Sequence, residues 1–227
     1  MGLSASLGRM GRMQIHAFSR SLASLGSPRS AASEPASGDR VTLSQPATGP
    51  VPAGQPSLRQ RLDALKLKPE EVTHVLYHDP CFDGYGAAWA AHRALGDRAQ
   101  YIGVNYDEPV PELPRDAKVA IVDFSYPREK LLALKEQVAD LVVLDHHKTA
   151  EEGLQGLSFA VFEKTRAGAG IAWEYFHPHK AVPALVSYVE DRDLWKWELP
   201  QSREVSAALA SYPREFSVWN QLDTDLE

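Results

Sequence analysis

Short apolar runs alternate with amphipathic stretches of helix length from residue 72 onward. The apolar runs predict five β-strands, at 74–78, 100–106, 118–124, 140–146 and 158–163. The amphipathic stretches predict helices at 84–95, 127–138, 168–177, 182–190 and 203–211. The strands are nearly continuous in Val, Ile and Leu, which indicates that both of their faces are buried. We therefore predict an α/β fold with an open, mostly parallel five-stranded sheet and helices on both faces.

The first 57 residues lack this pattern. Residues 1–33 contain four arginines and eight serines but no Asp, Glu or Lys, and residues 34–57 are dense in Pro, Gly, Ser and Ala. The first part is typical of an organelle transit peptide, which predicts a mitochondrial or plastid protein, or else of a disordered tail on a cytoplasmic protein. Residues 1–57 are thus expected to lie outside the fold, and 58–227 to form one domain that starts with a helix capped by Ser57.

The composition narrows the class of protein. With 227 residues, 44% of them hydrophobic and 24% charged, the chain suits a soluble globular domain. No apolar run approaches the roughly 20 residues of a transmembrane helix, so we expect no membrane partner. The single cysteine, Cys81, excludes an internal disulfide. A net charge of -6 argues against adhesion to duplex nucleic acid, but not against a few phosphates bound through metal ions.

Acidic residues and histidines follow the predicted strands. They are His78 and Asp83 after the first, Asp123 closing the third, and Asp145, His146 and His147 closing the fourth, with Asp191 and Asp193 after a later helix. The carboxyl ends of parallel strands meet at one edge of a sheet, so these segments should converge. Clustered carboxylates repel one another unless a cation compensates them. The oxygen-rich set predicts one or two divalent ions, Mn²⁺ first, with Mg²⁺ or Zn²⁺ as alternatives.

Each of these residues also has a structural interpretation. His78 alone suits a hydrogen-bonded structural histidine, and Asp83 before a glycine suits a turn or a helix cap. Asp123 suits a ligand and a cap for the following helix equally well. The Asp145-His146-His147 tripeptide is more telling, because such groups at the end of a buried strand are costly without partners. An oxidoreductase with a nucleotide cofactor is set aside, since no G-x-G-x-x-G follows the first strand.

Four segments together resemble the motifs of the DHH phosphoesterases, over about residues 72–222. They are HDPCFDGYGAA, VDFSYP, LDHHKTA and VEDRDLW. The resemblance implies a metal-dependent phosphoesterase in which metal-activated water hydrolyses a short oligonucleotide, a nucleotide or another small phosphorylated substrate. It further implies that His78 binds the first ion and that Asp123 bridges both. The second ion would be bound by Asp83, His146 and Asp191, with Asp193 as the alternative to Asp191.

The same resemblance assigns catalytic roles. His147 would contact the phosphate or the leaving group, Asp123 would act through the ions, and Asp145 would orient the two histidines. Arg166 and Lys148 are candidates for a cation that binds the substrate phosphate. The GAG at 168–170 opens a predicted helix, whose N-terminus suits either a phosphate or close helix packing.

The chain departs from this family in its first motif. Cys81 stands where many members have an aspartate, although cysteine is usual there in one subgroup. A thiol in this position weakens Mn²⁺ binding and favours Zn²⁺. Asp79 is then a possible substitute ligand.

A second departure concerns length. The family typically carries a smaller C-terminal substrate-binding domain, whereas this chain ends at Glu227. We therefore expect a fragment, a short gene product, or an enzyme completed by a homodimer or another partner. The alternative is a catalytically inactive or incomplete metal-binding module. Trp195 and Trp197 suit the core better than a platform for a nucleobase.

Overall fold

The computed structural model describes residues 56–79, 81–106 and 108–226. The transit-peptide and disordered-tail predictions therefore concern residues outside the described part, except for Pro56 and Ser57. Ser57 caps helix α2 (Leu58–Asp63), since its side chain accepts a hydrogen bond from the Gln60 amide and the Gln60 side chain accepts one from the Ser57 amide. This reciprocal capping box satisfies two amide groups that would otherwise lack partners at the helix start.

A five-stranded parallel sheet forms the centre of the described chain. Its strands are β1 (His74–His78), β2 (Gln100–Val104), β3 (Lys118–Val122), β4 (Asp140–Asp145) and β5 (Ala160–Phe162), in the order β2-β1-β3-β4-β5. The predicted α/β class and the five strands are confirmed. Strands β2 to β5 are each one to three residues shorter than predicted.

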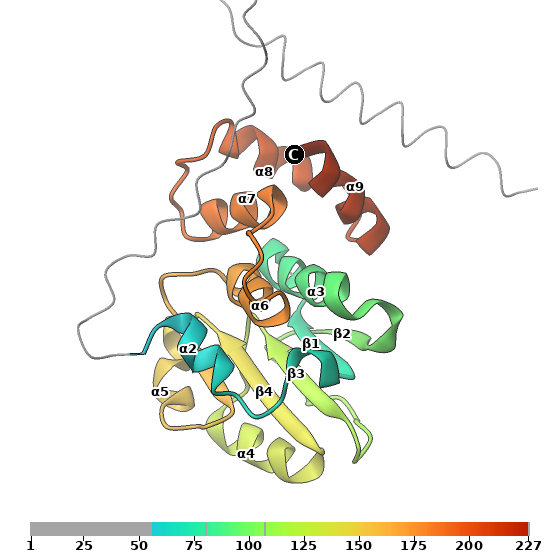
Figure 1. The fold of residues 1–227 in the computed structure, drawn as a ribbon, viewed down its shortest axis with the longest axis vertical. Helices are drawn as coiled ribbons and strands as arrows, with labels where there is room; N and C mark the ends of the chain where they lie inside the picture. The colour runs from blue at the N-terminus through green and yellow to red at the C-terminus, as the bar shows by residue number, and fades with distance from the viewer. Residues whose placement is uncertain (1–55, 80, 107, 227) are drawn as a thin grey trace, which may run out of the picture.

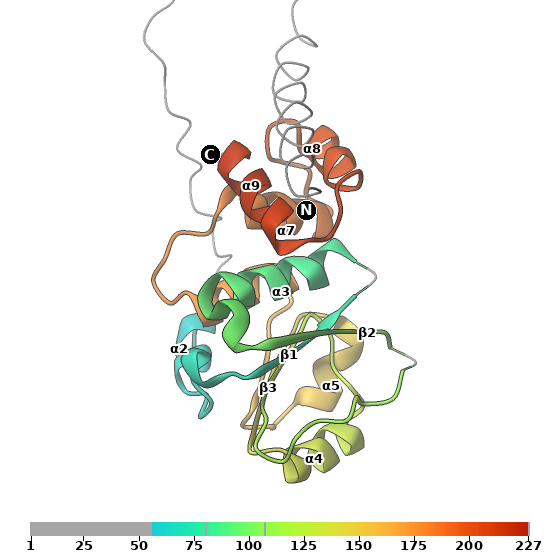
Figure 2. The same ribbon diagram turned by 90° about the vertical axis from the view of Figure 1, so that its right-hand side faces the viewer.

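Helices cover both faces of this sheet (Figures 1 and 2). They are α3 (Phe82–Leu95) and α6 (Gly168–Phe176) on one face, and α4 (Arg128–Gln137) and α5 (Glu151–Leu154) on the other. Successive strand residues point to opposite faces, so Val75 belongs to the core under α3 and α6 while Leu76 belongs to the core under α4. Both residues are fully buried, which explains the continuous apolar runs.

Three C-terminal helices form a further layer beyond α3 (Figure 2). They are α7 (Ala184–Asp193), α8 (Ser202–Leu209) and α9 (Phe216–Leu226), of which α9 was not predicted. Trp219 of α9 is fully buried and packs edge-on against Tyr85, with ring centres 4.8 Å apart. The described residues also contain three single-turn 3₁₀ helices, at Pro69–Glu71, Gly96–Arg98 and Lys148–Ala150. None of the helices in the described segments is long and apolar enough to cross a membrane.

The strand order creates a natural place for a site. From β1 the chain moves outward to β2 and then returns to β3 on the other side of β1. Connections after β1 and β3 therefore diverge, and a crevice forms at the carboxyl ends of these two strands. His78 ends β1, and Asp123 directly follows β3.

Candidate metal centre

Close backbone approaches bring the functional segments together at this edge. Helix α3 begins so near the end of β1 that a Cβ on Gly84 would lie 2.0 Å from the His78 carbonyl oxygen. Helix α6 begins against the side chain of Asp123, the residue after β3, because a Cβ on Gly168 would lie 2.4 Å from Asp123 Oδ1. Asp123 itself has a left-handed backbone with φ of 63°, held by a 3.0 Å hydrogen bond from its amide to the Leu144 carbonyl. Such strained residues cluster at functional sites.

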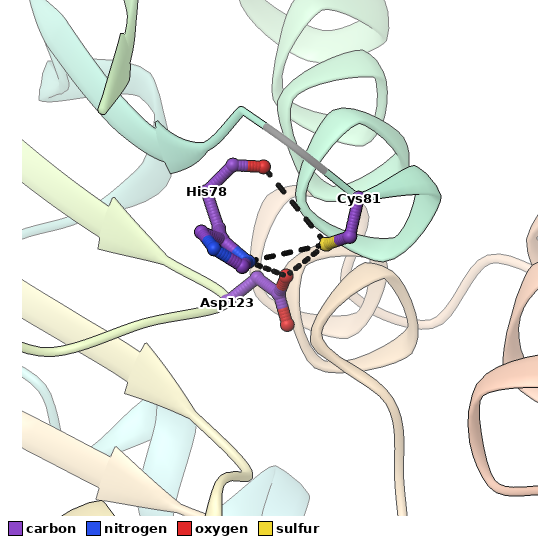
Figure 3. Close-up of side chains that lie close together, drawn as sticks. All are labelled: His78, Cys81 and Asp123. Carbon is purple, nitrogen blue, oxygen red and sulfur yellow. Dashed lines mark hydrogen bonds and ion pairs between the residues drawn. The ribbon is translucent and has the colours of Figure 1, made fainter. Parts of the chain in front are cut away.

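Carboxylate, imidazole and thiol groups at this edge of the sheet lie close enough to one another to hold a metal ion. Three sets each have ligand atoms within 4.8 Å of one another, namely His78, Cys81 and Asp123; Asp123, His146 and His147; and Asp83, His146 and Asp193. The first set is drawn in Figure 3, where its three side chains point toward one another. Asp123 and His146 each belong to two sets, so they form the middle of the cluster.

The His146 ring nitrogen faces three carboxylates. Its Nε2 lies 3.1 Å from Asp123 Oδ1, 3.3 Å from Asp83 Oδ2 and 3.7 Å from Asp193 Oδ2. Burial lowers the pKa of His146, but Asp123 and Asp83 outweigh this effect and raise it to about 11. Nevertheless, Nε2 and Asp123 Oδ1 are buried without a hydrogen-bond partner in the right geometry. A bound cation would displace the Nε2 proton and satisfy both of these buried atoms.

The pKa values of the two buried aspartates, Asp83 and Asp123, are shifted in opposite directions. Asp83 Oδ2 and Oδ1 accept hydrogen bonds from the Gly168 and Ala169 amides at 2.6 and 2.8 Å. Burial, and then the charge on Asp123, raise the pKa of Asp83 well above its usual range. Burial also acts to raise the pKa of Asp123, but the neighbouring His146 and His78 imidazoles hold it well below its usual range. The two carboxylates are therefore an unfavourable pair of like charges when no cation is present, and a bound metal ion would compensate them.

The thiol of Cys81 is protonated under the same conditions. Burial and the facing Asp123 carboxylate raise its pKa. The thiol donates a hydrogen bond to Asp123 Oδ2 at 3.2 Å.

Asp145 orients the second histidine of the tripeptide. Its Oδ1 accepts hydrogen bonds from the His146 and His147 amides at 2.7 and 3.1 Å, and lies 2.9 Å from His147 Nδ1. The hydrogen bond to Asp145 raises the pKa of His147. The other ring nitrogen, Nε2, lies 3.2 Å from the Tyr106 hydroxyl. Tyr106 was missed in the sequence, where it was assigned as the last residue of the predicted strand 100–106, whereas β2 ends at Val104.

Of the two aspartates in the fourth motif, Asp193 lies in the cluster and Asp191 does not. Asp191 Oδ1 accepts a hydrogen bond from the Glu198 amide at 2.9 Å, and Oδ2 accepts one from the Ser202 hydroxyl. The predicted preference for Asp191 as a ligand is thus corrected: its buried carboxylate anchors the loop after α7. The alternative, Asp193, faces His146.

Arg166 does not face the cluster as a free cation. Its Nε lies 2.8 Å from Glu190 Oε2, and a second nitrogen pairs with Glu174. Only 6% of Arg166 is exposed, so this buried ion pair replaces the predicted phosphate contact. The α6 N-terminus is likewise engaged by Asp83 rather than free for a phosphate.

Two other candidates lie at the periphery. Lys148 is exposed directly after the histidine pair. Asp79 is exposed, and its carboxyl group lies against β2, where a Cβ on Gly103 would meet it at 2.9 Å. Asp79 belongs to none of the three sets of ligand atoms, so its role as a substitute ligand stays a prediction.

The expectation that Trp195 belongs to the core is wrong. Trp195 is 74% exposed, while Trp197 is partly buried, with ring centres 5.2 Å apart. Both residues have left-handed backbones, with φ of 57° and 56°. The loop that Asp191 anchors therefore presents an indole two residues from Asp193.

Comparisons with known proteins returned relatives of unknown function. No protein-family model matches the chain. The uncharacterized protein R106 of Acanthamoeba polyphaga mimivirus is 30% identical over 167 residues, covering 66% of this chain and 40% of the relative. The chain thus spans about 40% of the length of the curated relative it matches. A crystal structure of an uncharacterized protein from Helicobacter pylori G27 matches with a TM-score of 0.46 and 16% identity, over 56% of this chain and 44% of that one.

Proposed function

We propose that this protein is a metal-dependent phosphoesterase of the DHH type, acting on a short oligonucleotide, a nucleotide or another small phosphorylated substrate. The observation that carries the proposal is the meeting of carboxylates and imidazoles from four segments at the switch point of a parallel sheet, with two buried donor atoms left unpartnered. The residues that would hold the ions are His78, Asp83, Asp123, His146 and Asp193. When bound, divalent ions supply a nucleophile from water and neutralise charge that develops on the phosphoryl oxygens.

The chain's own residues position the substrate. His147, whose Nδ1 is held by Asp145, presents Nε2 outward at the rim beside Tyr106. In its protonated form His147 would donate a hydrogen bond to a phosphoryl oxygen, and the hydrogen bond to Asp145 favours that form. Asp145 therefore acts as a positioning residue, because it fixes which nitrogen of His147 faces the substrate.

Arg192 takes the place that sequence reasoning gave to Arg166. Its guanidinium lies 4.7 Å from the centre of the Phe82 ring, and Phe82 lies between Cys81 and Asp83 in the chain. Burial raises the pKa of Asp193, and the charge of Arg192 opposes this rise. We propose that this guanidinium, which belongs to the residue before Asp193, binds a substrate phosphate through two parallel hydrogen bonds.

The test is hydrolysis by purified protein that has been stripped with a chelator and reloaded with Mn²⁺. The substrates are a generic phosphodiester and a dinucleotide, and the variant is Asp123→Asn, which keeps the shape and tolerates the left-handed backbone. We expect the variant to lose activity by about a thousandfold, because the ions supply several kcal/mol of charge stabilisation. The matched control, Asp97→Ala, removes a fully exposed carboxylate and should leave activity unchanged.

Two results would contradict the proposal. Full activity in Asp123→Asn would place the chemistry elsewhere. Metal-loaded wild type that hydrolyses none of a broad panel of phosphoesters would instead favour the catalytically inactive metal-binding module. Because the chain spans only part of its mimivirus relative, the panel should be repeated with a polypeptide that supplies the rest of that relative's length.

A further inference from the structure

The His78, Cys81 and Asp123 side chains form a triangle of donor atoms with the dimensions of a metal site. Cys81 Sγ lies 3.3 Å from His78 Nδ1 and 3.2 Å from Asp123 Oδ2, and the latter two atoms are 3.8 Å apart (Figure 3). In a tetrahedral site with bonds of roughly 2.0–2.3 Å, neighbouring ligand atoms lie about 3.3–3.8 Å apart. Each side of the observed triangle is within a few tenths of an ångström of that range.

Helix capping alone does not explain a cysteine at this position. Cys81 is the N-cap of α3, where its Sγ accepts a hydrogen bond from the Gly84 amide at 3.2 Å. Serine, threonine, asparagine and aspartate cap helices better than cysteine does. The thiol also lies against Asp123, a carboxylate with no exposed surface. A thiol whose sulfur is fixed by a backbone amide and aimed at a buried carboxylate suits a ligand better than a cap.

The other side of Asp123 has a different chemical character. Asp123 Oδ1 faces His146, which also faces Asp83 and Asp193, so that side offers oxygen atoms and one nitrogen. Asp123 Oδ1 and His146 Nε2 are among the buried side-chain atoms of the described residues that have no hydrogen-bond partner. Asp123 thus separates a set that contains sulfur from a set that contains only oxygen and nitrogen. Thiolate with imidazole selects Zn²⁺ or Fe²⁺, whereas carboxylate-rich sets suit Mn²⁺ or Mg²⁺.

We infer that the centre holds two unlike ions, Zn²⁺ bound by His78, Cys81 and Asp123, and Mn²⁺ bound by Asp123, Asp83, His146 and Asp193. The inference rests on the metal dependence in the proposed function and adds that Cys81 is a ligand. When the zinc ion binds, the thiol proton passes to solvent and the Sγ–metal bond replaces the hydrogen bond to Asp123. The chain contains one cysteine, so any thiolate–metal signal reports on Cys81 alone.

The first experiment reads the thiolate directly, without substrate. The full chain is stripped of metal and loaded with Co²⁺, a spectroscopic substitute for zinc. We expect a near-ultraviolet thiolate-to-cobalt charge-transfer band in wild type and its loss in Cys81→Ser, which keeps a helix-capping hydroxyl. Asp193→Asn is the matched control, because it should lose bound cobalt from the other set and keep the band. Circular dichroism melts of the metal-free proteins check that each variant folds.

The second experiment reads metal choice by elemental analysis after loading with equal Zn²⁺ and Mn²⁺. Wild type should retain both metals, and Cys81→Asp should lose its zinc at least tenfold relative to manganese. A cobalt-loaded wild type without the band, or an undiminished band in Cys81→Ser, would overturn the inference. Hydrolysis without the band would leave the proposed phosphoesterase intact, and a band without hydrolysis would leave Cys81 a ligand in a protein of another function. A wild type that binds no cobalt would overturn both.

Discussion

Replacement of Gly168 by alanine tests whether close approach of α6 to β3 builds the metal centre. A Cβ at this position would lie 2.4 Å from Asp123 Oδ1 and 2.6 Å from Asp123 Cβ, whereas ordinary contacts begin at 3.4 Å. The carboxylate must therefore move by about 1 Å, and since Asp123 is fully buried it has no empty space to enter. Overpacking of this size destabilises a protein by about 1–3 kcal/mol. A displaced ligand should also weaken metal binding by roughly 10- to 100-fold.

The assay has two parts. Urea unfolding of the metal-free protein measures the loss of stability, and titration against a chelating dye measures metal affinity. Gly153→Ala in α5 is the matched control, because a Cβ there would meet nothing within 4 Å. That variant should be unchanged or more stable by about 0.5–1 kcal/mol, as alanine is favoured over glycine inside helices. If Gly168→Ala behaved like Gly153→Ala in both measurements, the packing argument for the centre would be refuted.

Three further predictions follow from individual side chains. In the metal-free protein, charged His146 contributes stability that is complete below pH 6.5 and lost as the pH rises toward its folded pKa of about 11. The urea midpoint of wild type relative to His146→Gln should fall across that range, and a constant difference would contradict the prediction. Arg166→Met should lower the free energy of unfolding by about 3–5 kcal/mol, because it breaks a buried ion pair with Glu190, and it should leave kcat unchanged. A higher KM at unchanged stability would instead show that Arg166 binds the substrate phosphate. Trp195→Ala should leave the melting temperature unchanged, because the indole is exposed. If a substrate base stacks on this indole, the variant should raise KM for a nucleotide substrate roughly five- to hundredfold and leave KM for a substrate without a base unchanged. Equal changes in the two KM values would exclude stacking.

Much of the sheet was predictable because its strands are buried on both faces. Residues such as Val142 and Val143 face opposite cores, and each requires an apolar side chain. Continuous apolar runs with helices between them then leave few arrangements other than a parallel sheet. The convergence of polar groups follows from the same topology, since every strand carries its C-terminal residue to the same edge.

The loop after α7 shows where local pattern misleads. Alternating Trp195 and Trp197 around a lysine resemble a strand with one buried face, yet both have left-handed backbones that no propensity predicts for tryptophan. The conformation accompanies hydrogen bonds that Asp191 accepts from the Glu198 amide and the Ser202 hydroxyl across the loop. The alternation of apolar and polar residues does not reveal these side-chain hydrogen bonds, so it does not predict which tryptophan is exposed.

The choice between Asp191 and Asp193 depends on helix phase, which the sequence does not reveal here. Two residues along a helix rotate the side chain by about 200°, so only one of the two can face β4 and His146. The spacing of apolar residues normally shows which face of a helix is buried. Helix α7 packs against α3, α6, α8 and α9, so it has several buried faces and this spacing does not distinguish them. Asp191 is buried and Asp193 is exposed, and the loop at 194–202 engages the Asp191 carboxylate while Asp193 faces His146. The resemblance to the DHH motifs implied Asp191 or Asp193 as a ligand. Asp191 is engaged by the Glu198 amide, whereas Asp193 faces His146 and is the one available to a metal ion.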